Sequence, residues 1–217
     1  QQEDSVPVKK VDSVKVAKTQ PLTYKILVPF NYRLCNPDTI INRNWVELYK
    51  DGKDYYVGKA RYGIEMREDA CSSTIPTYLA EKRNTILFIN QLPIKKGKVK
   101  IADVAFSDST YLEPGSVRNF TFAGKHYKLE ARAQGESQLK NYTLLLNGER
   151  IVREARVDAA SFALLFAGDL DGDGKLDLVL SLPRDYEELR VALFLSSCAP
   201  PGLQIGKAAE IEDDFSC

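Results

Sequence analysis

Short apolar runs recur along most of this chain, and several of them alternate with polar positions. Tyr127, Leu129 and Ala131 alternate with charged residues, which predicts a strand with one solvent-exposed face. Residues 162–166 and 176–182 are apolar at most positions, and runs of this length fit buried strands better than helices. Strands therefore dominate the predicted secondary structure.

Two hairpins are indicated by turn residues between strand-like runs. Asp51-Gly52 lies between the runs 45–49 and 55–57. Asn147-Gly148 lies between 142–146 and 150–157. Asn-Gly suits the type I′ turn, whose twist matches that of the flanking strands. Hairpins of this kind join neighbouring antiparallel strands.

The evidence for helices is limited to two segments. Residues 76–83 could form two helical turns, and residues 186–190 could form one. Many short strands at near-regular spacing predict a mostly β fold with antiparallel sandwich or barrel-like sheets and few short helices. The last predicted strand covers 190–195, and the acidic segment 210–214 is interpreted as a tail.

A turn-rich segment at 113–116, Glu-Pro-Gly-Ser, marks a domain boundary. It divides the chain into a flexible lead at 1–22, a β subdomain at 23–115 and a second β subdomain at 116–217. A single continuous β domain remains the alternative.

Composition narrows the class of protein. Of the 217 residues, 44% are hydrophobic, which supports a packed core and argues against disorder. Basic and acidic residues number 30 each, so the formal net charge is zero and a nucleic-acid partner is not expected. No apolar run approaches the roughly 20 residues of a membrane helix, so no transmembrane segment is predicted.

The four cysteines lack the Cys-x-x-Cys spacing of zinc or redox motifs. Their even number is typical of an oxidising compartment, and nearness in sequence favours the pairs Cys35–Cys71 and Cys198–Cys217. Four free thiols are the alternative. The chain begins at Gln1 rather than methionine, as expected if a signal peptide has been removed or if the sequence was trimmed at its start. We therefore expect a secreted or periplasmic protein.

Residues 168–180 read GDLDGDGKLDLVL and carry the most specific chemistry of the sequence. Calcium takes about six to eight oxygen ligands, which a short loop supplies by turning alternate carboxylates inward. The predicted calcium ligands are the side chains of Asp169, Asp171, Asp173 and Asp177 and the backbone carbonyl of Lys175. Gly174 stands where the backbone must turn sharply. An acidic surface turn is the alternative, and magnesium is disfavoured because it demands a stricter octahedron.

The loop departs from the helix–loop–helix calcium motif in two respects. Its twelfth position is Leu180 and not the bidentate glutamate. Its flanks are strand-like, so we expect a β-hairpin that carries an ion loop.

This stretch resembles the calcium loops of FG-GAP and VCBS-type repeats in secreted bacterial proteins, over about residues 162–202. The matching residues are Phe166, Gly168, Asp169, Asp171, Gly172, Asp173, Gly174, Asp177 and Leu178. The resemblance implies calcium ligation at the four aspartates. A propeller would need several such blades, whereas the chain contains one loop.

The sequence gives little indication of a catalytic site. His126 is the only histidine, it falls on the solvent-exposed face of its strand, and no nucleophile motif accompanies it. We therefore expect a calcium-stabilised, non-catalytic binding or scaffold protein of the cell envelope, with a protein or glycan as the partner considered. Exposed aromatic residues can contact such partners, but in β proteins aromatic residues more often fill strand faces. A secreted, glycan-acting hydrolase with a structural calcium ion is the alternative, and a purely structural subunit is a third interpretation.

Overall fold

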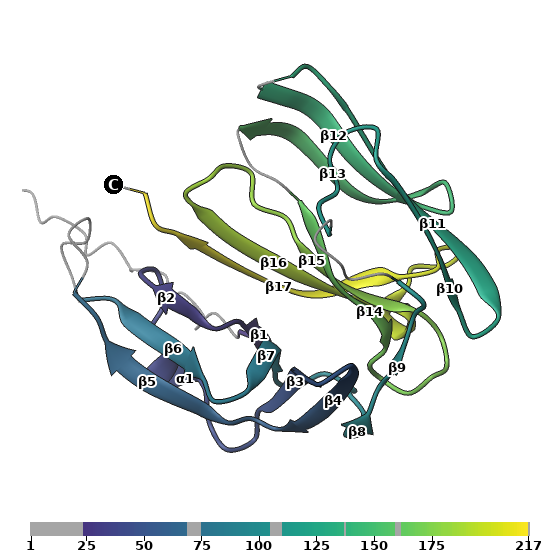
Figure 1. The fold of residues 1–217 in the computed structure, drawn as a ribbon. Helices are drawn as coiled ribbons and strands as arrows, with labels where there is room; N and C mark the ends of the chain where they lie inside the picture. Colours follow the sequence, from purple (N-terminus) through teal and green to yellow (C-terminus); the bar gives the residue numbers. More distant parts are fainter. Residues whose placement is uncertain (1–23, 69–74, 105–109, 137, 159–161, 217) are drawn as a thin grey trace, which may run out of the picture.

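The computed structural model describes residues 24–68, 75–104, 110–136, 138–158 and 162–216. Within these ranges the chain is mostly β, its sheets are antiparallel, and none closes into a barrel (Figure 1). The predicted fold class is therefore confirmed. The helical segments are short, namely α1 (Pro37–Ile40) and the 3-10 helix η1 (Ser196–Cys198). The predicted lead at 1–22 lies outside the described residues.

The described residues form four sheets, and neighbouring strands in each sheet pair in the following orders. The N-terminal sheet contains β1 (Ile26–Leu27), β7 (Asn84–Ile89), β3 (Val46–Asp51), β4 (Asp54–Lys59) and β8 (Gly97–Lys98). The small sheet contains β2 (Phe30–Tyr32), β6 (Thr77–Glu81) and β5 (Tyr62–Met66). The central sheet contains β17 (Gly206–Asp214), β16 (Glu188–Leu195), β15 (Asp177–Ser181), β14 (Ala163–Asp169) and β9 (Lys100–Ile101). The outer sheet contains β10 (Val117–Phe122), β11 (Lys125–Gln134), β12 (Gln138–Leu146) and β13 (Glu149–Asp158).

The central sheet is buried on both faces. Figure 1 shows it between the outer sheet and the two sheets formed by the first hundred residues. Leu178 and Leu180 of β15 pack into a core shared with the outer sheet. Val179, between them, packs into a second core shared with the N-terminal sheet, and Leu193 of β16 joins it there. Successive side chains of a strand point to opposite faces, so a strand covered on both sides is apolar at nearly every position.

Both predicted hairpins are present. Strands β3 and β4 pair from Val46 with Lys59 to Asp51 with Asp54. Strands β12 and β13 pair up to Leu146 with Glu149. Asn147 and Gly148 have φ angles of 50° and 86°, as a type I′ turn requires.

Two sequence predictions are wrong at the level of secondary structure. Residues 76–83 do not form a helix, because residues 77–81 are strand β6, which pairs with β2 on one side and β5 on the other. The segment 186–190 is not a helical turn, because β16 begins at Glu188. Hydrogen bonding to neighbouring strands decided both cases against weak local helix preference.

The acidic segment at 210–214 is not a tail. It belongs to β17, which pairs along its length with β16 and buries Ile211 and Asp213. The Asp213 carboxylate accepts hydrogen bonds from the backbone N–H groups of Arg33 and Leu34, at 3.1 and 3.0 Å. The strand therefore fastens the connection between β2 and α1 to the central sheet.

Cys35 and Cys198 carry free thiols, and burial raises the pKa of Cys35 to about 12. Their predicted partners, Cys71 and Cys217, lie outside the described residues. Neither predicted disulfide is therefore supported. The predicted subdomain boundary after residue 115 stays a prediction.

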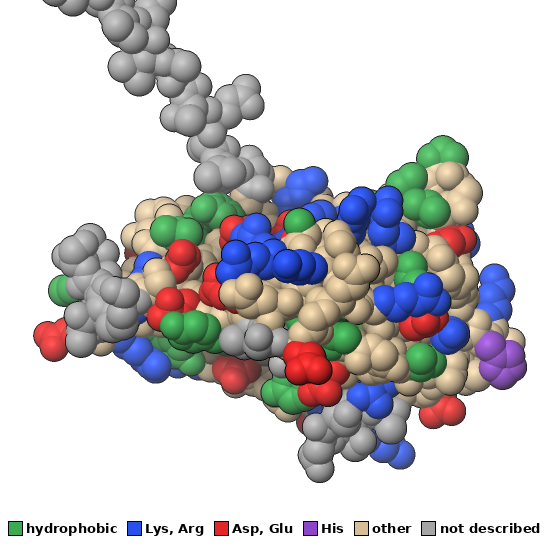
Figure 2. All heavy atoms as spheres, turned by 90° about the horizontal axis from the view of Figure 1, so that it is seen from above, with side chains coloured by type: hydrophobic (Ala, Val, Ile, Leu, Met, Phe, Trp, Pro, Cys, Tyr) green, Lys and Arg blue, Asp and Glu red, His purple; other side chains and the backbone are tan. Residues whose placement is uncertain are grey.

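The outer surface is mixed in character. On the face drawn in Figure 2, basic and acidic side chains are interspersed and hydrophobic side chains form small scattered groups. No helix in the described part of the chain is long and apolar enough to cross a membrane.

Candidate metal loop and adjacent cleft

The aspartate loop connects β14 to β15 at one end of the central sheet. Gly168 pairs with Asp177 at its base. Gly172 and Gly174 have φ angles of 81° and 82°, a region that glycine adopts without steric cost. The sharp turn predicted at Gly174 is present.

The aspartates organise the backbone of this loop. Each backbone N–H from residue 170 to residue 175 donates to an aspartate side chain of the loop. Asp169 accepts two of these bonds, from Gly172 at 2.6 Å and from Gly174 at 3.1 Å. Side chains of this type commonly bond to backbone N–H groups one or more residues ahead. Aspartate at these positions therefore has a structural reason as well as a chemical one.

Three of the predicted ligands converge. Asp169, Asp171 and Asp177 each offer a carboxylate oxygen, and these oxygens lie within 4.8 Å of one another. Asp177 is fully buried, and Oδ2 of Asp171 is buried without a hydrogen-bond partner within the described residues. A buried anionic oxygen without a partner is costly unless a cation or another donor compensates it.

Burial raises the pKa of Asp177 to about 7, and the nearby Asp171 carboxylate acts in the same direction. The backbone N–H groups of Ser196 and Leu170 act in the opposite direction, at 2.8 and 2.7 Å. Burial therefore disfavours the charged form of Asp177, and a nearby cation would stabilise that form.

Asp173 and Lys175 are placed differently from the three clustered aspartates. Oδ2 of Asp173 accepts a 2.8 Å hydrogen bond from Oγ of Ser196 and lies 3.7 Å from the Lys175 ammonium. Desolvation opposes the charged form of Asp173, but hydrogen bonds from Ser196 and Lys175 outweigh it, so the pKa of Asp173 lies below its usual value. The Lys175 side chain is 66% exposed, as predicted for a residue that would offer only its backbone carbonyl.

Ser196 is a member of this site that the sequence did not reveal. It lies at the start of η1, immediately after β16. Its N–H donates to Asp177 and its hydroxyl to Asp173. It is buried, and it joins the middle and the C-terminal end of the loop to the segment that follows β16.

Lysines cover the other side of the loop. A hollow of about 220 Å³ is lined by Lys95, Lys98 and Lys100 together with loop residues. The N–H of Lys95 donates to the carbonyl of Leu170 at 2.8 Å. These positive charges lower the repulsion among the loop carboxylates, whether or not an ion binds.

Gly168 is required by the close approach of β9. A methyl group added there would lie 2.4 Å from the Lys100 carbonyl oxygen and 2.7 Å from the Phe166 ring. We expect Gly168→Ala to separate β9 from β14 and to cost about 1–3 kcal/mol of stability, the usual range for overpacking.

Urea denaturation of Gly168→Ala measures this cost. The matched control is Gly58→Ala, since an added Cβ at this strand glycine meets nothing closer than 3.4 Å. Equal midpoints for the two variants would contradict the steric explanation.

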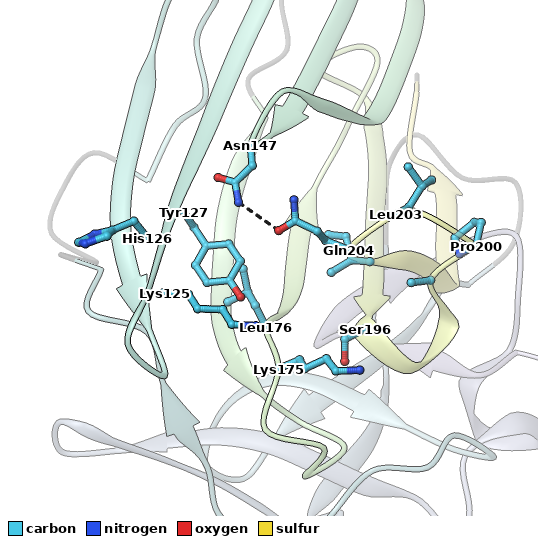
Figure 3. Close-up of a pocket in the computed structure, with 12 residues that line it drawn as sticks. Lys125, His126, Tyr127, Asn147, Lys175, Leu176, Ser196, Pro200, Leu203 and Gln204 are labelled. Atoms are coloured by element: carbon cyan, nitrogen blue, oxygen red, sulfur yellow. Dashed lines mark hydrogen bonds between the residues drawn. The ribbon is translucent and has the colours of Figure 1, made fainter.

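A cleft of about 460 Å³ lies beside the loop (Figure 3). It is bordered by the start of β11, the end of the aspartate loop and the segment that follows β16. Figure 3 shows the Tyr127 ring pointing into the cleft and His126 pointing away from it. His126 is exposed, as its place in the strand predicted.

The chain matches no protein-family model, and no curated protein and no solved structure is significantly similar to it. The resemblance of residues 162–202 to FG-GAP and VCBS-type calcium loops therefore rests on the loop sequence.

Proposed function

We propose that this chain is a secreted or periplasmic, non-catalytic binding or scaffold protein whose fold is stabilised by calcium at the aspartate loop. The observation that carries the proposal is the buried Oδ2 of Asp171, which has no partner within the described residues although its side chain stands beside Asp169 and Asp177. Oxygen-rich, carboxylate-dominated sites suit calcium. Asp173 and the Lys175 carbonyl are proposed to complete the coordination.

Calcium at this loop would act as a structural clamp. The loop joins two adjacent strands of the doubly buried central sheet, so an ion bound to it would stabilise the folded state by mass action. The strand flanks, in place of paired helices, argue against a calcium-driven opening of the sensor type.

The cleft beside the loop gives no support to the hydrolase alternative. None of the described residues that line it is a carboxylate, whereas glycoside hydrolysis normally uses two. A hydrolase would have to use another part of the surface, such as the hollow of about 760 Å³ that is lined by Asp54 and Asp103.

Calcium removal is expected to lower the melting temperature of the wild-type protein. Free calcium at one hundred times its dissociation constant adds about 2.7 kcal/mol, which corresponds to roughly 5–10 °C for a chain of this size. Thermal melts followed by circular dichroism, in EGTA and in calcium chloride, measure the shift.

The control variants are Asp171→Ala and Asp185→Ala. Asp171→Ala should abolish the calcium response, whereas Asp185, an exposed residue outside the loop, should leave it intact. Magnesium chloride at the same concentration tests selectivity. A wild-type melt that is identical in EGTA and in calcium would refute the proposal.

A further inference from the structure

The cleft beside the aspartate loop presents hydrogen-bond donors and positive charge. Its charged lining residues are Lys125 and Lys175, and no aspartate or glutamate among the described residues lines it. This bias is notable because the whole chain has equal numbers of basic and acidic residues. The Lys175 ammonium lies 3.7 Å from the Asp173 carboxylate, which offsets part of its charge. Exposed lysine ammonium groups attract anions.

Two amide side chains add directed donors at the opposite wall. The Asn147 side-chain amide donates to Oε1 of Gln204 at 3.0 Å, and Oδ1 of Asn147 accepts from the Lys128 N–H at 2.8 Å. These bonds orient both amides, and the Gln204 NH₂ group keeps its two donor hydrogens for a ligand. In Figure 3 the linked pair faces Tyr127 and the lysines across the opening.

An apolar wall completes the cleft. Tyr127, Leu176 and Leu203 line it, and the Tyr127 ring is held in place by stacking on Phe120, with 5.7 Å between ring centroids. Burial raises the pKa of Tyr127, so its hydroxyl stays protonated and able to donate at neutral pH. The volume of about 460 Å³ is within the usual range for small-molecule sites.

The cleft and the aspartate loop share structural elements. Lys175 and Leu176 end the loop and also line the cleft. Ser196 lines the cleft as well, while its N–H and hydroxyl are bonded to Asp177 and Asp173. An ion that fixes the loop carboxylates would therefore also fix part of the cleft wall.

We infer that this cleft binds a monosaccharide-sized ligand that bears a carboxylate, and that calcium in the loop raises its affinity. The lysines and the Gln204 amide bind the carboxylate and hydroxyl oxygens, while Tyr127 and the exposed Leu203 contact the ring. The calcium step rests on the proposed function, whereas ligand binding does not.

The test is a titration of the ¹⁵N-labelled protein with D-glucuronate, followed by NMR in calcium and in EGTA. We expect saturable shifts of the Asn147 and Gln204 side-chain amides. D-Glucose, a neutral sugar of the same ring size, should bind at least about tenfold more weakly, since a charge-assisted hydrogen bond is lost. Acetate shows whether the carboxylate alone suffices.

Substitutions of the lining residues test where glucuronate binds. Lys125→Ala and Gln204→Ala should each weaken glucuronate binding about tenfold. Lys53→Ala, which removes the same charge from the exposed turn between β3 and β4, should not. Amide spectra of each variant show whether its fold is retained. Calcium should tighten glucuronate binding about fivefold, at the lower end of typical coupling.

The outcomes separate the two proposals. Absent or non-saturable shifts, or equal binding of glucose and glucuronate, would overturn the ligand assignment while leaving the calcium site intact. Glucuronate affinity that is unchanged by calcium, in a protein shown to bind calcium, would overturn the coupling. A protein that binds no calcium would overturn the proposed function and the coupling together, and the EGTA titration would still decide the ligand.

Discussion

Glu47→Ala is expected to destabilise the protein by about 3–5 kcal/mol, the usual cost of removing one partner of a buried ion pair. Glu47 lies in β3 and its side chain is fully buried. Its carboxylate accepts hydrogen bonds from the Thr85 hydroxyl at 2.6 Å and from Nε of Arg83 at 2.7 Å. The truncation leaves both donors without their acceptor in the interior.

The contacts of the Arg83 side chain hold its guanidinium group in a partly buried position. Its side chain is only 20% exposed. Its guanidinium stacks on the Tyr49 ring, 3.7 Å from the centroid, and donates to the Lys59 carbonyl at 2.9 Å. A cation fixed in this way cannot regain full hydration when Glu47 is removed, so the charge stays partly desolvated.

Urea denaturation of Glu47→Ala gives the cost. The matched control is Glu65→Ala, because Glu65 pairs with Arg67 on the surface, with both side chains about half exposed. An exposed pair of this kind contributes about 0–1 kcal/mol. If the two variants had the same stability, the buried network of Glu47, Arg83 and Thr85 would not be a major source of stability.

The periodicity of the sequence predicted where the strands lie better than it predicted which sheets pack against them. Residues 176–182 and 190–195 are mostly apolar, and this composition alone predicted that they form buried strands. Which sheet covers each face is set by contacts between residues far apart in the chain, such as Phe166 with Tyr55. The two-sided burial of the central sheet therefore emerged only from the structure.

Local ambiguity explains why strands β6 and β17 were not predicted. Residues 77–81 have no decisive helix or strand preference, and pairing with strands on both sides selected the strand. In β17, the acidic residues obscured an alternation in which Ile211 and Asp213 point inward. A buried aspartate at an apolar position of the pattern is difficult to anticipate, since it depends on the N–H groups of Arg33 and Leu34.

The aspartate loop was the most predictable part of the candidate site. Its spacing predicted the convergence of Asp169, Asp171 and Asp177 and the turn at Gly174. Spacing also assigned Asp173 as an equal ligand, whereas its side chain bonds to Ser196. Ser196 lies 19 residues beyond Asp177, and the pairing of β15 with β16 brings the two together. Local spacing carries no information about such a contact.

Asp177→Ala is expected to lower the free energy of unfolding by about 2–5 kcal/mol even in calcium-free buffer. The buried N–H groups of Leu170 and Ser196 would each lose their acceptor, and an unsatisfied buried donor costs about 1–3 kcal/mol. Alanine also leaves a gap where the fully buried carboxylate stood. The same substitution should abolish the calcium-dependent rise in melting temperature.

Asp171→Ala is the matched comparison for this prediction. Among the described residues, its Oδ1 accepts one bond, from the exposed N–H of Asp173 at 3.1 Å, so its loss should change calcium-free stability by well under the cost at Asp177. Both variants should lose the calcium response, and only Asp177→Ala should lose intrinsic stability. Denaturation of both variants in EGTA and in calcium separates the two roles. If Asp171→Ala were as unstable as Asp177→Ala in EGTA, the loop aspartates would act as one structural unit, and the unpartnered oxygen of Asp171 would no longer argue for an ion.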